Sequence, residues 1–206
     1  MLSIFKSTQN GLERIDEIST GSWVSVVDPS NAEIQQLTVL GIPHDYITYP
    51  LDMDERARTE REDDGTMFIL IRIPVKAKDG DPENVPFYTI PMGIVLTDQV
   101  IITVCKYETS LMQEFESGRI RGLSTGKRIR FVLRLLLQNA TKFLSYLREA
   151  EKSTEALEDN LLLSMKNKEL KELLRYQKSL VYFTTALRSN ELMMERLKKT
   201  PLFHRF

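Results

Sequence analysis

The densest group of side chains that could do chemistry lies between residues 51 and 65, where the sequence reads LDMDERARTEREDDG. Carboxylate oxygens of this kind suit Mg²⁺, which keeps several waters and needs only one or two protein carboxylates. The run also fits a solvated helix face followed by a turn, because arginines alternate with the acids, and this is the commoner origin of such a pattern. Both interpretations stay open.

No set of residues predicts catalysis. The single cysteine, Cys105, lies in an apolar run typical of a strand, while His44 and His204 are far apart and have no partners at metal-ligand spacing. GLSTGKR (122–128) approaches a phosphate-binding loop, but its two glycines are too close together and arginine follows the lysine. We therefore expect neither an enzyme nor a zinc site, and a helix-entry loop at GLSTGKR.

Composition narrows the class of protein further. The 206 residues are 42% hydrophobic and 28% charged, and the formal net charge of -1 provides no overall attraction to nucleic acid. One unpaired cysteine fits a reducing, cytoplasmic compartment. The N-terminus has acidic residues where a secretory signal needs an apolar region, and no stretch approaches the ~18 apolar residues of a membrane span. We expect a soluble chain.

The first part of the chain predicts an α+β domain. SWVSVVD (22–28) is typical of a strand, and TMFILIRIPV (66–75) fits a strand that is buried on both faces. FYTIPMGIVL and QVIITV predict a hairpin across residues 97–98. Prolines in these runs, Pro74, Pro86 and Pro91, favour strand ends or edges.

Two short helices are predicted by their capping residues. Ser30 and Glu33 have the spacing of a capping box, and Gly41 marks the end of the helix that follows. Ser110 and Gln113 predict a second such helix near the end of the α+β domain. The glycine-containing segment SGRIRGLSTGKR then predicts a basic loop.

Beyond this loop the sequence predicts two long helices. Apolar or small residues recur at Leu133, Leu136, Ala140, Phe143, Leu147, Ala150, Thr154, Leu157 and Leu161, which indicates a helix of about forty residues. The polar residues 166–168 permit a reversal, with Asn167 as the N-cap of the second helix. Its stripe comprises Leu173, Tyr176, Leu180, Phe183, Leu187, Asn190, Met194 and Leu197, and Pro201 ends it. We expect the helices to lie antiparallel and bury these stripes against each other, with Asn190 setting the register.

The predicted organisation is an α+β domain over 1–123, a long antiparallel helical hairpin over 124–200 and a tail over 201–206. More apolar residues lie on the other faces of the two helices, and they predict a surface that a third helix or another subunit covers. These residues are Leu135, Leu137, Leu144, Leu162, Leu163, Leu174, Val181, Leu192 and Met193.

Four stretches, in this order, resemble the cytoplasmic domain of the CorA family of magnesium and divalent-cation transporters. They are SWVSVVDPSNAEIQQLTVLGIP, LDMDERARTEREDDGTMFILIRIP, PFYTIPMGIVLTDQVIITV and KSLVYFTTALRSNELMMERL. The resemblance implies an α/β/α sandwich, a mixed β-sheet flanked by short helices, that carries the two long helices. It also implies a homopentamer in which a stalk helix follows and leads to two membrane spans with a Gly-Met-Asn motif. This chain contains none of these last parts, so the tail would lead to a missing stalk.

By this resemblance, the chain is the cytoplasmic part of a transporter of the cell membrane, with Mg²⁺ as both the transported and the regulatory ion; Co²⁺, Ni²⁺ and Zn²⁺ stay open. Mg²⁺ between neighbouring subunits would bridge carboxylates, and its loss would open the pore. Members of the family often have adjacent Glu-Asp where this chain has Thr48-Tyr49. Asp52 and Asp54 are the nearby substitutes and our candidate ligands. The alternative function is a soluble helical scaffold without transport activity.

Overall fold

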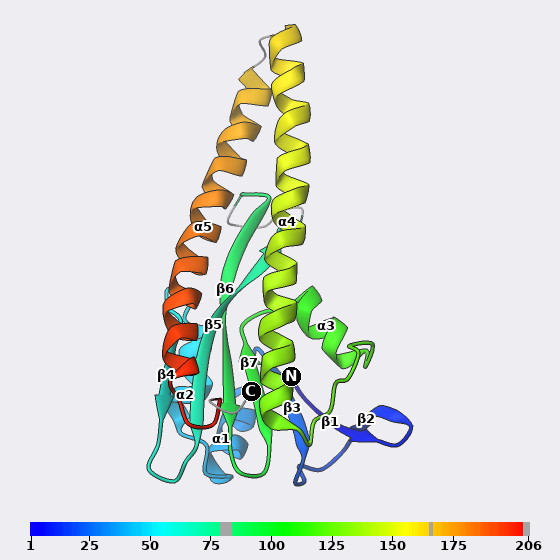
Figure 1. Ribbon diagram of the computed structural model, residues 1–206, viewed down its shortest axis with the longest axis vertical. Helices are drawn as coiled ribbons and strands as arrows, with labels where there is room; N and C mark the ends of the chain where they lie inside the picture. The colour runs from blue at the N-terminus through cyan, green and yellow to red at the C-terminus, as the bar shows by residue number, and fades with distance from the viewer. Residues whose placement is uncertain (79–83, 165–166, 204–206) are drawn as a thin grey trace.

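The computed structural model describes residues 1–78, 84–164 and 167–203. Its centre is one seven-stranded sheet with the strand order β2-β1-β3-β7-β6-β5-β4 (Figure 1). Neighbouring strands are antiparallel except for β3 and β7, which are parallel, so the sheet is mixed as predicted. The strands are β1 (Leu2–Thr8), β2 (Gly11–Ile15), β3 (Ser22–Val27), β4 (Arg58–Arg61), β5 (Met67–Lys76), β6 (Phe87–Leu96) and β7 (Ile101–Cys105).

Helices cover both faces of the sheet, which gives the expected α/β/α sandwich (Figure 1). One face carries α1 (Asn31–Val39), α2 (His44–Thr48) and the short 3-10 helix η1 (Tyr49–Leu51). The other face carries α3 (Ser110–Glu116), α4 (Arg128–Ser164) and α5 (Asn167–Lys198). The last two are the predicted antiparallel hairpin, and their far ends project beyond the sheet.

The sheet is buried on both faces, which explains the continuous apolar run of β5. Phe68 turns towards the α1–α2 side, where its ring stacks on Tyr46 at 4.5 Å between centroids. On the other side, Trp23 lies against Phe131 of α4 at 5.1 Å and Phe115 of α3 at 6.2 Å. Since Trp23 and Phe131 share one core, the α+β part and the helices pack together. The division near residue 124 stays a prediction.

The predicted stripe of α5 is wrong at two positions, because α5 packs against the sheet as well as against α4. Leu180 and Leu187 are 42% and 38% exposed. The face towards the sheet is instead marked by the buried residues Ser179, Phe183, Ala186, Met193 and Leu197. Strands β5 and β6 are ten residues long and outreach their neighbours, so they offer α5 an apolar surface that the sequence pattern does not display.

Three strands were not predicted. The β1–β2 hairpin forms one edge of the sheet, and β4 forms the other. Strand β4 lies in the acidic run 51–65, so the helix face that was the alternative interpretation of this run is wrong. The run forms turns around a short edge strand, because Arg58–Arg61 pair with residues 67–70 of β5.

Helix ends match the prediction in part. The capping box of Ser30 and Glu33 is confirmed, with reciprocal side-chain and backbone hydrogen bonds. The cap of α3 is Thr109 rather than Ser110, because the Thr109 hydroxyl accepts a hydrogen bond from Met112 N at 3.3 Å. Asn167 is the first residue of α5 and not its cap, and the preceding position lies outside the described residues.

The prolines sit where the sheet has only two strands. Pro74 and Pro91 are inside β5 and β6, but beyond the residues that pair with β4 and β7. A missing N–H costs no ladder hydrogen bond on an edge that faces no neighbouring strand. This agrees with the expectation that these residues occupy local edges.

Candidate functional site

Asp52 and Asp54 lie together in an exposed turn between η1 and β4. The carboxylate of Asp52 accepts a hydrogen bond from the backbone N–H of Asp54 at 3.0 Å, which holds the turn. Two exposed carboxylates fit a weak Mg²⁺ site in which water or another subunit supplies the remaining ligands. Among the described residues, no cluster of three or more His, Cys, Asp or Glu side chains could hold a metal by itself.

Several other acids of the run make contacts within the chain. Arg58 forms ion pairs with Glu55 and with Glu60, the latter at 2.5 Å. Glu62 accepts a hydrogen bond of 2.6 Å from the Tyr46 hydroxyl, and burial together with this bond raises the pKa of Tyr46. These contacts tie Glu55, Glu60 and Glu62 to neighbouring side chains, whereas Asp52 and Asp54 are exposed and belong to no ion pair of the described residues.

Asp63 and Asp64 are also exposed, but they lie in a different turn, at the other end of β4. The Asp64 carboxylate accepts hydrogen bonds from the backbone N–H of Thr66 at 2.7 Å and from the Thr66 hydroxyl at 3.1 Å. These contacts hold the turn that leads into β5, on the far side of β4 from Asp52 and Asp54. The structure therefore separates the acidic run into two groups at the two ends of β4.

Arg72 of β5 anchors the turn that carries Asp52 and Asp54. Its guanidinium donates hydrogen bonds to the carbonyl of Met53 at 2.6 Å and to that of Glu55 at 3.1 Å. It also donates to the Thr89 carbonyl at 2.7 Å and to the Thr89 hydroxyl at 3.0 Å. Burial lowers the pKa of Arg72, and the negative charge of Asp54 opposes this shift. An arginine keeps its charge in such a place, so the turn rests on a fixed cation.

The backbone of Arg72 is bound in turn by the two long helices. Asn190 of α5 accepts from Arg72 N and donates to Arg72 O, both at 2.8 Å. Asn139 of α4 donates to the same carbonyl at 3.1 Å. In addition, Ala57 N donates to the hydroxyl of Ser189 at 2.9 Å. The acidic turn is therefore connected to both helices through one strand residue and one direct hydrogen bond.

These contacts correct the role predicted for Asn190. Its side chain binds the open edge of β5 as a further strand would, rather than a residue of α4. Neither Arg72 nor Asn139 was singled out from the sequence. The signal for Arg72 was present, because it is the one charged residue within the apolar run TMFILIRIPV. Asn139 left no comparable signal.

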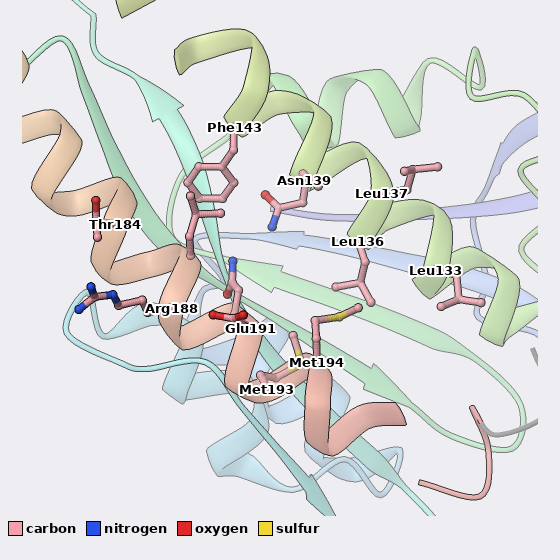
Figure 2. Close-up of a pocket in the computed structure, with 13 residues that line it drawn as sticks. Leu133, Leu136, Leu137, Asn139, Phe143, Thr184, Arg188, Glu191, Met193 and Met194 are labelled. Carbon is pink, nitrogen blue, oxygen red and sulfur yellow. The ribbon is translucent and has the colours of Figure 1, made fainter. Parts of the chain in front are cut away.

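An apolar groove of about 730 Å³ lies between α4 and α5 (Figure 2). Its lining includes Leu133, Leu136, Phe143, Met193 and Met194. Asn139 extends from α4 into the space between the helices, and its Oδ1 atom is buried without a hydrogen-bond partner among the described residues.

The surplus apolar residues predicted on these helices divide into three groups. Leu135 and Met193 are buried in the core, so their predicted exposure is wrong. Exposed positions are Leu137, Leu144, Leu174, Val181 and Leu192. The side chains of Leu162 and Leu163 lie outside the described residues.

The remaining sequence candidates do not assemble into a catalytic or metal site within the described residues. Burial raises the pKa of the Cys105 thiol to about 12, so it is protonated at neutral pH. His44 is exposed next to Asp45, and His204 lies outside the described residues. Residues 122–127 form a loop that leads into α4, which confirms the predicted helix-entry loop.

Comparison with known proteins identifies the family. Residues 19–204 match the family described as CorA-like Mg²⁺ transporter protein. The soluble domain of CorA from Methanocaldococcus jannaschii is 22% identical, with a TM-score of 0.80 over 96% of this chain and 79% of its own. The complete CorA magnesium transporter from the same organism is 21% identical, with a TM-score of 0.79 over 97% of this chain. No curated protein matches.

The ZntB cytoplasmic domain from Vibrio parahaemolyticus RIMD 2210633 has the same fold at 12% identity, with a TM-score of 0.71 over 96% of this chain and 78% of its own. This chain spans 63% of the complete CorA transporter. Within the described ranges, none of the helices is both long and apolar enough to cross a membrane. Because the family match extends over most of the sequence, the chain belongs to the family of CorA-like Mg²⁺ transporter proteins.

Proposed function

We propose that this chain is the cytoplasmic regulatory part of a divalent-cation transporter, and that Mg²⁺ bound at the Asp52–Asp54 turn controls conduction. The family match over residues 19–204 carries the first half of this proposal. The second half is supported by the exposure of both carboxylates, neither of which belongs to an ion pair of the described residues.

The proposed mechanism rests on charge repulsion between subunits. Two turns of this kind that face each other across an interface repel, because each carries two carboxylates. A divalent cation between them removes the repulsion and provides shared oxygen ligands. Mg²⁺ changes the equilibrium between two subunit arrangements only through its different affinity for them, so loss of the ion favours the separated arrangement.

Arg72 connects this turn to the long helices through hydrogen bonds. A shift of the turn moves the carbonyls of Met53 and Glu55, which bind the Arg72 guanidinium. The Arg72 backbone is held by Asn139 and Asn190, so α4 and α5 share the displacement. This linkage consists of hydrogen bonds that join the turn, β5 and the two long helices, and such a contiguous network can transmit coupling.

The proposed assembly is a homopentamer in the cell membrane, with this part on the cytoplasmic side and a stalk helix after residue 206. The groove between α4 and α5 is a suitable place for that helix, because it is apolar and open.

A scaffold that binds a partner helix in this groove is the competing function. The gene sequence after the Phe206 codon separates the two: apolar segments of ~20 residues around Gly-Met-Asn support the transporter, and a stop codon supports the scaffold.

Sedimentation of the chain with and without millimolar Mg²⁺ tests the cation response. We expect a monomer or weak oligomer without the ion and association with it, because Mg²⁺ bridges the turns. Asp52→Ala/Asp54→Ala should abolish the response. A matched control is Asp16→Ala/Glu17→Ala, which removes two exposed, adjacent carboxylates on another edge and should leave the response intact. An equal response in both variants would show nonspecific charge screening instead.

A further inference from the structure

The segment from Gly118 to Arg134 is strongly basic although the whole chain carries a net charge of -1. It contains no acidic residue, and its six basic residues are Arg119, Arg121, Lys127, Arg128, Arg130 and Arg134. The segment comprises the loop between α3 and α4 and the first two turns of α4. No step of the proposed cation response uses these residues.

Two of the arginines converge on one glycine. A Cβ atom placed on Gly122 would lie 3.0 Å from an Nη2 atom of Arg130 and 3.5 Å from that of Arg134. The two guanidinium groups therefore lie side by side over the backbone of Gly122, four residues apart on one face of α4. Like charges at this distance repel, and the ion pairs of the described residues include neither arginine.

The nearest acids in the sequence are occupied elsewhere. Glu114 forms an ion pair with Lys142, and Glu116 accepts a hydrogen bond of 2.6 Å from the Ser25 hydroxyl. The first turn of α4 contains no acidic side chain, although the N-terminal end of a helix favours negative charge. An external anion at the arginine pair would supply the negative charge that this part of the chain lacks.

The loop that completes this arrangement is fixed to the sheet. Ser7 N donates to the Thr125 hydroxyl at 2.9 Å, and Thr125 N donates to the Ser7 hydroxyl at 3.0 Å, with Thr125 fully buried. Gly122 has a φ of 71°, which an L side chain rarely adopts and which brings the loop backbone under the guanidinium groups. The loop backbone that meets the two arginines is therefore preorganised.

We propose that Arg130 and Arg134, where they meet over Gly122, form a binding site for a phosphate group. Paired guanidinium groups bind the oxygens of a phosphate dianion through two or more charge-assisted hydrogen bonds, which a single lysine does not match. The exposed Arg119 and Arg121 of the same loop add to the positive potential around the site. The phosphate group belongs to a free phosphate, a nucleotide or a lipid headgroup.

Binding is measured on the complete 206-residue chain by calorimetry with inorganic phosphate and with ATP, and by co-sedimentation with vesicles containing phosphatidic acid. We expect saturable binding in at least one of the three, weakened at least tenfold in Arg130→Gln/Arg134→Gln. The ligand that binds identifies the source of the phosphate group. Arg130→Lys/Arg134→Lys keeps both charges and should bind with intermediate affinity, because the paired guanidinium geometry is lost.

Arg148→Gln is the matched control, since Arg148 is an exposed arginine farther along α4. It should bind as the unaltered chain does, and circular dichroism of every variant should report unchanged helix content. Binding that is equal in the arginine-pair and control variants would overturn the proposal. Absence of binding in all three measurements would overturn it as well.

Discussion

Replacing Arg72 by methionine should lower the free energy of unfolding by about 3 kcal/mol and release the acidic turn. Methionine keeps most of the apolar stem, but it leaves the carbonyls of Met53, Glu55 and Thr89 without their donor. Removing a buried charge recovers part of its desolvation cost, which is why the expected loss is smaller than the sum of four hydrogen bonds. Urea unfolding measures the change in stability.

Hydrogen exchange distinguishes the local effect of this substitution from a general loss of stability. We expect residues 52–57 to exchange faster in Arg72→Met, while the β3–β7 pair keeps its relative protection. Arg56→Met is the matched control, because Arg56 is an exposed arginine in the same turn. If exchange of residues 52–57 stayed as slow as in the unaltered chain, Arg72 would not be the anchor of the turn.

The second large effect is expected at Trp23 of β3, whose side chain is completely buried beneath α3 and α4. Its ring lies 5.0 Å from Phe5 and 5.1 Å from Phe131, and its Nε1 donates to the Thr103 hydroxyl at 2.9 Å. Trp23→Ala removes these contacts and leaves a cavity, so we expect a loss of about 4 kcal/mol. In a chain of this size that corresponds to a fall in Tm of about 12 °C, which calorimetry measures.

Trp23→Phe provides the comparison. Phenylalanine keeps an aromatic ring against Phe5 and Phe131 and loses the hydrogen bond to Thr103 together with part of the ring volume. We expect it to cost roughly half as much as alanine. A loss below about 1 kcal/mol for Trp23→Ala would mean that the helices contribute little to the core that they share with the sheet.

Local signals in the sequence predicted the central elements well. The unbroken apolar run of β5 indicates a strand covered on both faces, and the structure places helices on both sides of it. Ser30 and Glu33 predict a helix start because both partners of the capping box lie within four residues. Such features depend on neighbours in the chain, which is why they can be read without the fold.

The connections between elements could not be predicted in the same way. Asn190 and Arg72 are 118 residues apart, and their hydrogen bonds exist only because α5 lies along the open edge of β5. Helical spacing placed Asn190 in an apolar stripe, where the same residue type would serve to set register. The edge strand β4 was hidden because its charged residues lack apolar alternation. Tertiary packing, rather than local preference, decides these positions.

The two carboxylates of the candidate site were named from the sequence through a family resemblance. The structure places them in one exposed turn, with the Asp54 amide on the Asp52 carboxylate. The sequence did not indicate that Arg72 anchors this turn, because a single arginine in a strand does not show which carbonyls it binds. The turn and its anchor together make the proposed cation response specific enough to test.

The most direct test of a cation site at this turn is a residue-resolved NMR titration of the chain with Mg²⁺. The Asp54 amide donates to Asp52, so cation binding should shift its resonance with saturation in the millimolar range. Asp52→Ala/Asp54→Ala should remove the saturable component. Small, linear shifts of similar size at Asp16, Glu17 and the Asp52–Asp54 turn would contradict the account, since they would show screening without a site.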